Sequence, residues 1–251
     1  TYLPLGEYHA FNPLVARAKQ ARDLFLIIGP PGTGKTSFGL LNLLKEELLE
    51  QETNILLLSY TNRAVDEICS KLVESHIDFL RIGSELSCDP AYKDWLLNSK
   101  TGKLKRGSEV EQLLAQTRVV CGTTVALNAS SELFSLKHFH LAIVDEASQI
   151  LEPHLIGLLS AHNGDENAID RFVLIGDHKQ LPAVVQQSED ESLVTEPDLR
   201  HIHLTNCRYS LFERLLKGFK TTQGYDPRYV YMLTRQGRMH TAIADFPSRQ
   251  F

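Results

Sequence analysis

The sequence predicts an α/β domain whose parallel β-sheet is covered by helices on both faces. Short apolar runs alternate along the chain with segments of helical composition, which is the pattern of strands joined by crossover helices. Several runs are continuously apolar, as expected for strands that are buried on both faces. A glycine-rich loop at residues 29–36 also joins one apolar run to a leucine-rich segment, in the order strand, loop, helix.

The predicted strands, in chain order, cover residues 24–28, 54–59, 79–82, 118–121, 140–144, 172–175 and 229–232. The predicted helices cover roughly residues 11–21, 35–50, 62–75, 108–116, 152–160, 209–218 and 239–245. Two polar stretches interrupt this alternation. Residues 83–109 are basic and predict a small insertion on the core, whereas the acidic residues 186–200 predict a mobile loop. We therefore expect residues 1–251 to form a single domain.

Composition narrows the class of protein without naming a function. The chain carries 26 Lys and Arg against 31 Asp and Glu, a net charge of -5, so no global basic character advertises nucleic-acid binding. A single basic groove on an acidic protein remains compatible with these numbers. The 4 cysteines include no C-x-x-C pair, which argues against a zinc site or a disulfide framework. With no signal peptide and no apolar run of about 18 residues, we expect a soluble, cytoplasmic protein.

The glycine-rich loop has the composition of a phosphate cradle. Its residues are Gly29, Pro30, Pro31, Gly32, Thr33, Gly34, Lys35 and Thr36. Glycines allow the backbone to turn its N–H groups inward around phosphates, and the following helix adds the positive end of its dipole. Lys35 can reach the β- and γ-phosphates, and the Thr36 hydroxyl can ligate Mg²⁺. The loop predicts binding of a nucleoside triphosphate.

Two further strands end in side chains suited to phosphate chemistry. The run 141–144 ends in Asp145 and Glu146, where Asp145 is placed to hold Mg²⁺ and Glu146 to orient and deprotonate the attacking water. A switch protein does not need that second carboxylate, whereas a hydrolase does. The run 172–175 leads into a loop with Gln180, which can contact the γ-phosphate because ligands lie at the carboxyl ends of parallel strands.

These motifs resemble those of superfamily 1 helicases, in the branch of the RNA helicase of nonsense-mediated decay and its DNA-helicase relatives. The segments occur in that family's order: GPPGTGKT (29–36), SYTNRAVDEI (59–68), VVCGTT (119–124), VDEASQ (144–149), GDHKQLPAVV (176–185) and QGRMH (236–240). The resemblance runs from about residue 11 to the end. It implies a P-loop NTPase fold with a RecA-like parallel sheet and a nucleic-acid-dependent ATPase with helicase or translocase activity.

The resemblance also implies contacts to a single strand of DNA or RNA. Thr61 and Asn62 match the family's first nucleic-acid-contacting loop, and Thr123 and Thr124 match its second. Such contacts go mainly to the backbone of the strand and carry little sequence preference. The motifs do not distinguish RNA from DNA.

The nucleotide site follows the family pattern with two departures. Gln180 matches the residue that couples the γ-phosphate to the strand-binding face, and Arg238 matches an arginine that approaches the γ-phosphate. Gly237 stands where the family often has a base-stacking tyrosine, and Val15 stands where it has a glutamine that reads adenine. We expect a weak preference for ATP over GTP, or one carried by other residues such as Gln20.

Helicases of this type have two RecA-like domains, and the resemblance covers only the first, so we expect a fragment. The catalytic arginine of a second domain is worth roughly 10³–10⁵ in rate in related systems, so this chain alone should hydrolyse ATP feebly and unwind nothing. The alternative is a nucleotide-dependent protein-binding module without strand separation. Glu146 argues against that alternative, and Gly237 and Val15 argue mildly for it. A ring-forming AAA-type ATPase fits the loop after strand 172–175 poorly.

Overall fold

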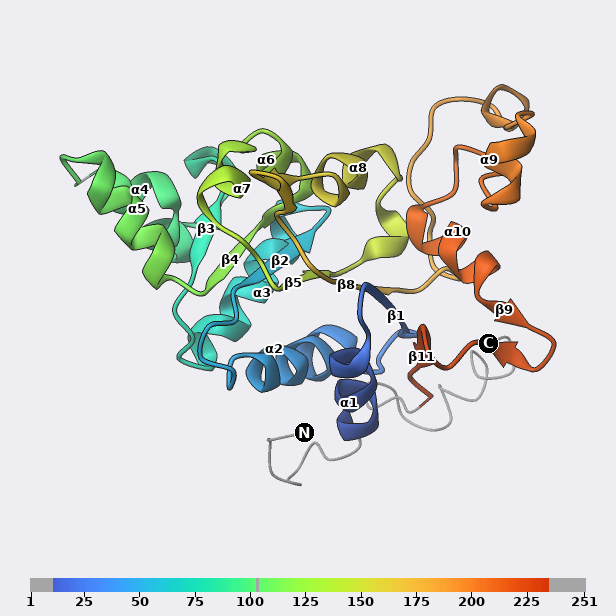
Figure 1. Ribbon diagram of the computed structural model, residues 1–251, viewed down its shortest axis with the longest axis horizontal. Helices are drawn as coiled ribbons and strands as arrows, with labels where there is room; N and C mark the ends of the chain where they lie inside the picture. Colours follow the sequence, from blue (N-terminus) through green and yellow to red (C-terminus); the bar gives the residue numbers. More distant parts are fainter. Residues whose placement is uncertain (1–10, 103, 235–251) are drawn as a thin grey trace.

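The computed structural model describes residues 11–102 and 104–234, and its centre is a seven-stranded parallel sheet (Figure 1). The strands lie in the order β11-β1-β8-β5-β2-β4-β3. Their bounds are β1 Leu24–Ile28, β2 Ile55–Ser59, β3 Leu80–Ile82, β4 Val119–Thr123, β5 Leu141–Val144, β8 Phe172–Gly176 and β11 Val230–Met232. The predicted fold class and all seven predicted strands are confirmed, and no strand end differs from its prediction by more than two residues.

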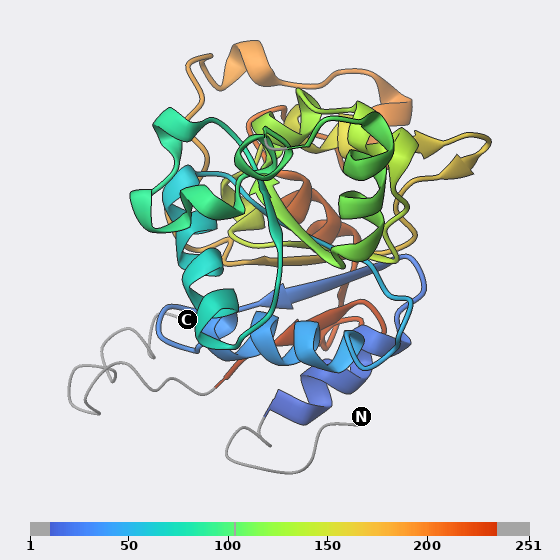
Figure 2. The same cartoon turned by 90° about the vertical axis from the view of Figure 1, so that its left-hand side faces the viewer.

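Helices cover both faces of the sheet, as Figure 2 shows. On one face lie α1 (Asn12–Gln20), α2 (Leu41–Glu47) and α3 (Asn62–Glu74). The other face carries α5 (Gly107–Gln116), α6 (Thr124–Asn128), α7 (Glu132–Leu136), α8 (Pro153–Leu159) and α10 (Leu211–Gly218). In β1, Phe25 packs toward the first face and Leu26 toward the second. The strands are continuously apolar because successive side chains enter two separate cores.

The predicted helix 35–50 begins differently from an ordinary α-helix. Lys35–Leu40 form a π-helical turn, η2, in which the N–H of Gly39 donates to the carbonyl of Gly34 at 3.0 Å. A π-turn of this kind widens the helix where the glycine-rich loop enters it. The α-helix proper then ends at Glu47, three residues before the predicted end. The predicted helix 239–245 lies outside the described residues.

The two polar stretches contain more regular structure than the sequence indicated. Residues 83–109 include the short helices η3 (Glu85–Ser87), η4 (Pro90–Trp95) and α4 (Leu97–Thr101) and the start of α5. Residues 186–200, expected to be a loop, include η6 (Asp190–Ser192) and most of α9 (Pro197–His201). A β-bridge between Leu193 and Asn206 ties this segment to the chain that follows. Short helices of this length carry too weak a periodicity to be predicted.

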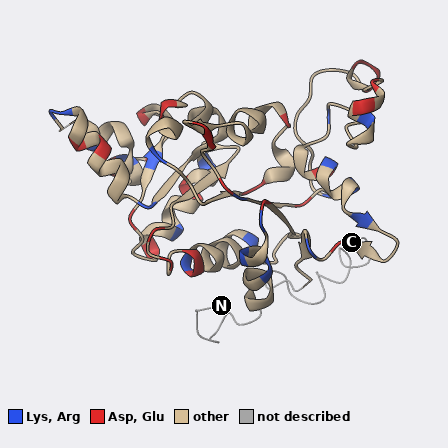
Figure 3. Cartoon of the chain, viewed as in Figure 1, with Lys and Arg blue, Asp and Glu red and all other residues tan. Residues whose placement is uncertain are grey.

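The short helix η5 (Ala147–Gln149) and two small hairpins complete the described secondary structure. The hairpins are β6–β7 (His162–Asn163 with Glu166–Asn167) and β9–β10 (Lys220–Thr221 with Gly224–Tyr225). Basic and acidic residues are interspersed over the helices, strands and loops of the described chain (Figure 3). In the described part of the chain, no helix combines the length and the apolar character needed to cross a membrane.

Candidate active site

The glycine-rich loop leaves the carboxyl end of β1 as a tight turn. Gly32 and Gly34 have φ angles of 77° and 74°, in the left-handed region that glycine adopts without steric cost. The hydroxyl of Thr33 donates to the carbonyl of Pro30 at 2.8 Å and closes the turn. All eight loop residues predicted from the sequence, 29–36, therefore lie at one edge of the sheet.

A hydrogen bond joins this loop to the acidic motif that follows β5. Thr36 Oγ1 donates to Asp145 Oδ2 at 2.7 Å, although the two residues are 109 positions apart. The other carboxylate oxygen of Asp145 accepts the backbone N–H of Glu146 at 3.0 Å. Thr36 and Asp145, the two predicted Mg²⁺ ligands, are thus in direct contact.

Asp145 is a carboxylate in a buried position. The residue is only 2% exposed. Burial, together with the nearby charge of Glu146, raises the pKa of Asp145 to about 6, against the lowering effect of the Thr36 hydrogen bond. A buried carboxylate beside a hydroxyl oxygen is a donor set that suits a hard divalent cation such as Mg²⁺.

Lys35 and Glu146 form an ion pair at the mouth of the site. Lys35 Nζ lies 3.2 Å from Glu146 Oε1. Glu146 has a φ of 53°, a left-handed conformation that is uncommon for a non-glycine residue and is found most often at functional turns. The predicted phosphate-binding cation and the predicted general base therefore neutralise each other.

The loop after β8 is organised by a buried aspartate that the sequence did not single out. Asp177, 1% exposed, accepts the side-chain amide of Gln180 at 3.0 Å and the backbone N–H of Lys179 at 3.0 Å. Its own N–H donates to Ser148 Oγ at 3.2 Å. Ser148 belongs to the acidic motif after β5, so the Gln180 loop is fixed to that motif.

An open cavity of about 1210 Å³ lies beside these loops. Lys35, Thr36, Glu146 and Gln180 all contribute to its wall. The wall also contains residues that sequence reasoning missed as site residues: Phe11, Pro13, Glu67, Ser70, Lys71 and Tyr231. Their positions in the sequence carry no motif, because they reach the cavity from α3, β11 and the residues around the start of α1.

Two residues considered for base recognition do not line this cavity. Val15 is 2% exposed and packs in the core between α1 and the sheet. Gln20 is exposed at the last residue of α1, and it is absent from the described cavity wall, so the structure does not support it as a reader of the base. Gly237 and Arg238 lie outside the described residues.

The residues predicted to contact a nucleic-acid strand lie at the same edge of the sheet, just after β2 and at the end of β4. Thr61 caps α3, where its Oγ1 accepts the N–H of Ala64 at 3.2 Å, and Asn62 begins that helix. Thr123 caps α6 in the same way, and the hydroxyl of the buried Thr124 has no hydrogen-bond partner among the described residues. Since β2 and β4 are neighbours in the sheet, the two pairs lie close to each other and beside the cavity strands.

A side-chain hydrogen bond connects the acidic motif after β5 to the segment of predicted nucleic-acid contacts after β2. Ser59, the last residue of β2, donates to the backbone carbonyl of Asp145 at 3.3 Å within the protein core. The segment that begins with Thr61 therefore starts two residues from a contact with the acidic motif.

Replacing Gly34 by alanine should abolish tight nucleotide binding. The new Cβ would lie 2.6 Å from Cδ2 of Phe38, in a backbone conformation that costs an L-residue roughly 1–2 kcal/mol. We expect a loss of at least about tenfold in the affinity for a non-hydrolysable ATP analogue, measured by calorimetric titration. Gly39→Ala is the matched control, because its nearest contact would be an ordinary 3.9 Å. Unchanged binding by Gly34→Ala would contradict the predicted role of the turn.

Replacing Asp145 by asparagine should stabilise the nucleotide-free protein. Because the folded-state pKa of about 6 lies above the ordinary value of 3.8, the contribution of Asp145 to stability is fully present below pH 3.8 and is lost as the pH rises through about 6. The substituted amide carries no charge, so at pH 7.5 without metal we expect Asp145→Asn to gain up to about 3 kcal/mol in the free energy of unfolding. Urea denaturation between pH 4 and 8 tests this, and parallel pH profiles for both proteins would refute it.

The chain is similar in sequence to proteins of known family. The AAA domain family matches residues 12–104 and 91–188, more than half of the chain. The sequence is 37% identical over 231 residues to the human (Homo sapiens) DNA replication ATP-dependent helicase/nuclease DNA2, covering 91% of this chain and 19% of that protein. The Xenopus laevis protein of the same name is 34% identical over 229 residues, covering 90% and 19%. The chain therefore spans about a fifth of the length of these relatives.

A solved structure shares the fold. The helicase nonstructural protein 10 of an arterivirus, determined in complex with DNA, matches with a TM-score of 0.50 and 15% identity, over 92% of this chain and 42% of that one. Taken together with the motifs and their arrangement, the matches settle the family. The chain belongs to the AAA domain family, and its motifs resemble those of the first RecA-like domain of superfamily 1 helicases.

Proposed function

We propose that this chain hydrolyses ATP to drive movement along single-stranded DNA. The observation that carries the proposal is the convergence of Lys35, Thr36, Asp145 and Glu146 at neighbouring strand ends. The residues that match the family's nucleic-acid contacts lie next to them, where β2 and β4 end. The preference for DNA rests on the relatives, whose names describe DNA replication helicases.

The loop 29–36 would hold the triphosphate. Its backbone N–H groups and the amino end of the following helix favour anionic oxygens. Lys35 would pair with the β- and γ-phosphates. Since Lys35 is paired with Glu146 in the structure, arrival of the γ-phosphate gives the lysine a new partner and releases the carboxylate. Glu146 can then accept a proton from the attacking water.

Thr36 and Asp145 would hold Mg²⁺. A bound Mg²⁺ would supply positive charge that offsets the negative charge developing on the phosphates. Without it, the Thr36 hydroxyl keeps the buried carboxylate hydrogen-bonded.

Gln180, which also lines the cavity, would sense the γ-phosphate. Its amide is held by Asp177, and Asp177 is held by Ser148 of the acidic motif, so a displacement at the phosphates reaches both loops. Arg238 is proposed as a further γ-phosphate contact, on the sequence match alone.

The single-stranded nucleic acid would lie across Thr61, Asn62, Thr123 and Thr124. Thr61 uses its oxygen to cap α3, which leaves its hydroxyl proton available for a phosphate. The Ser59 contact to Asp145 joins this surface to the acidic motif. A second RecA-like domain would close over both sites, and without it hydrolysis should be slow.

The test is ATP hydrolysis by the full-length protein, with and without single-stranded DNA or RNA. We expect stimulation by DNA and a loss of at least about 10²-fold for Glu146→Gln, the scale of a general-base contribution. Glu166→Gln, on the exposed hairpin β6–β7, is the matched control. Stimulation by RNA alone would show that the nucleic acid is RNA rather than DNA. A rate of hydrolysis that neither polymer changes would refute translocation and favour the protein-binding module.

The base of the nucleotide would stack rather than be read by hydrogen bonds. Phe11 and Tyr231 supply aromatic surface to the cavity wall, and Val15 faces the core. We therefore expect kcat/KM for ATP and GTP to agree within about tenfold. Tyr231→Ala should raise KM about tenfold for both nucleotides with little change in kcat, which corresponds to one lost stacking contact. A strong preference for ATP, or an effect on one nucleotide only, would contradict this.

A further inference from the structure

Arg81 is a charged residue in the core of the sheet. It lies on β3, the edge strand, and its side chain is 1% exposed, the largest side chain that is fully buried in the described residues. Its neighbours Leu80 and Ile82 face the core on the α5–α8 side. By alternation, Arg81 points to the other face, where α3 covers the sheet.

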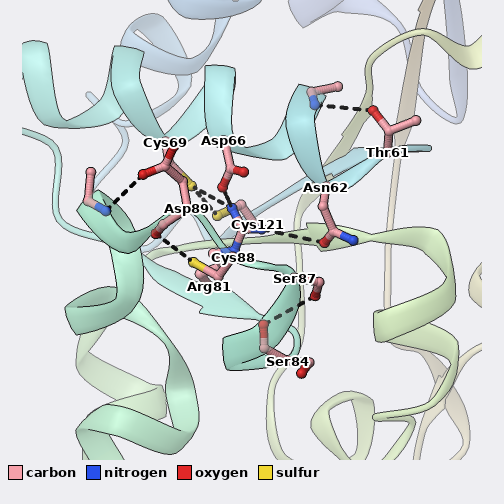
Figure 4. Close-up of polar contacts among 12 residues, drawn as sticks. Thr61, Asn62, Asp66, Cys69, Arg81, Ser84, Ser87, Cys88, Asp89 and Cys121 are labelled. Carbon is pink, nitrogen blue, oxygen red and sulfur yellow. Dashed lines mark hydrogen bonds and ion pairs between the residues drawn. The ribbon is translucent and has the colours of Figure 1, made fainter.

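The guanidinium is bonded to three residues of α3 (Figure 4). Nη1 forms an ion pair with Asp66 Oδ1 and lies 3.7 Å from Cys69 Sγ. Nη2 donates to Asn62 Oδ1 at 3.4 Å. Asn62, Asp66 and Cys69 lie on one face of the helix, at spacings of four and three residues. A single buried cation therefore spans the first two turns of α3.

Stability alone does not account for an arginine at this position. Apart from its partners on α3, Arg81 lies among buried apolar residues, with Cys121 opposite it on β4 and Phe79 preceding β3. A buried ion pair often contributes no more to stability than well-packed apolar residues of similar volume. Burial acts to lower the pKa of Arg81, but Cys69 and Asp66 more than offset it and the pKa lies above its ordinary value, so the group stays charged.

The polar contacts instead define the position of Asn62. Its side-chain oxygen is occupied by Arg81, so the amide nitrogen is directed away from the guanidinium (Figure 4). A primary amide has two N–H donors, and phosphate oxygens accept them. Without Arg81, the Asn62 amide can rotate and present either end. The Asp66 ion pair fixes the same helix one turn further on.

We propose that Arg81 is a positioning residue for strand binding, which holds the Asn62 amide and the first turns of α3 in the orientation that grips a nucleic-acid backbone. The inference rests on the proposed function, because it assigns a role to Arg81 through Asn62. Arg81 itself is buried and touches neither strand nor nucleotide.

The experiment uses the full-length protein and follows ATP hydrolysis against the concentration of single-stranded DNA. Arg81→Met, which keeps the volume and removes the charge, should raise the DNA concentration for half-maximal stimulation about tenfold, the scale of one charged hydrogen bond. The rate at saturating DNA and the KM for ATP should stay within about twofold. Asn62→Ala should show the same shift, and the double variant should bind DNA no more weakly than Asn62→Ala alone.

Arg118→Met is the matched control for a general loss of stability. Arg118 is a half-buried arginine that donates to the carbonyls of Thr53, Leu48 and Glu50 at the opposite ends of the strands. Its loss should lower the melting temperature without changing DNA affinity. If Arg81→Met does not fold, Arg81→Lys takes its place, because a lysine can pair with Asp66 but lacks the planar fork that also reaches Asn62.

The outcomes separate the inference from the proposed function. A wild type that binds neither DNA nor RNA and is stimulated by neither refutes the function and the inference together. A stimulated wild type whose DNA dependence is unchanged by Arg81→Met, or a double variant in which the two shifts multiply, refutes the inference alone.

Discussion

Everything in this structure depends on the fact that parallel strands end at the same edge of the sheet. The order β1-β8-β5-β2-β4 places five successive carboxyl ends side by side. Motifs that are distant in the sequence therefore meet there, and the hydrogen bond from Thr36 to Asp145 closes the first of these contacts. In an open parallel sheet this edge is where ligands bind.

The same edge divides into two regions. Strands β1, β8 and β5 end in the loops proposed to bind the nucleotide, and the residues proposed to contact a nucleic-acid strand follow β2 and end or follow β4. Besides the bond from Thr36 to Asp145, a hydrogen bond from Ser59 reaches the carbonyl of Asp145, and one from the N–H of Asp177 reaches Ser148. Because both involve the acidic motif, that motif is in contact with the Gln180 loop and with the start of the strand-contact segment. A change at the phosphates can therefore be transmitted through short, direct contacts.

The charged side chains of Asp145 and Arg81 are both buried in this structure. Asp145 is held charged in the core by a hydroxyl and a backbone N–H, and it is positioned for a cation. Arg81 is held charged by Asp66 and bonds to Asn62. Burial of either charge is unfavourable by itself. Each has a hydrogen-bond partner that belongs to, or lies beside, a motif of the site, although for Asp145 burial still outweighs these partners and raises the pKa.

The sequence by itself determined the seven strands, the phosphate loop and the acidic motif, because apolar runs and turn residues act locally and motifs have fixed spacing. It did not determine the π-turn after Gly34, the short helices of residues 186–200, or the strand order. Nor did it reveal that Lys35 pairs with Glu146, that Tyr231 reaches the cavity, or that Arg81 reaches under α3. These features arise from side chains that meet only when the sheet is assembled, and their spacing along the chain carries no periodic signal. Tertiary packing decided them, since it sets which residues are buried together and which partner each buried charge obtains.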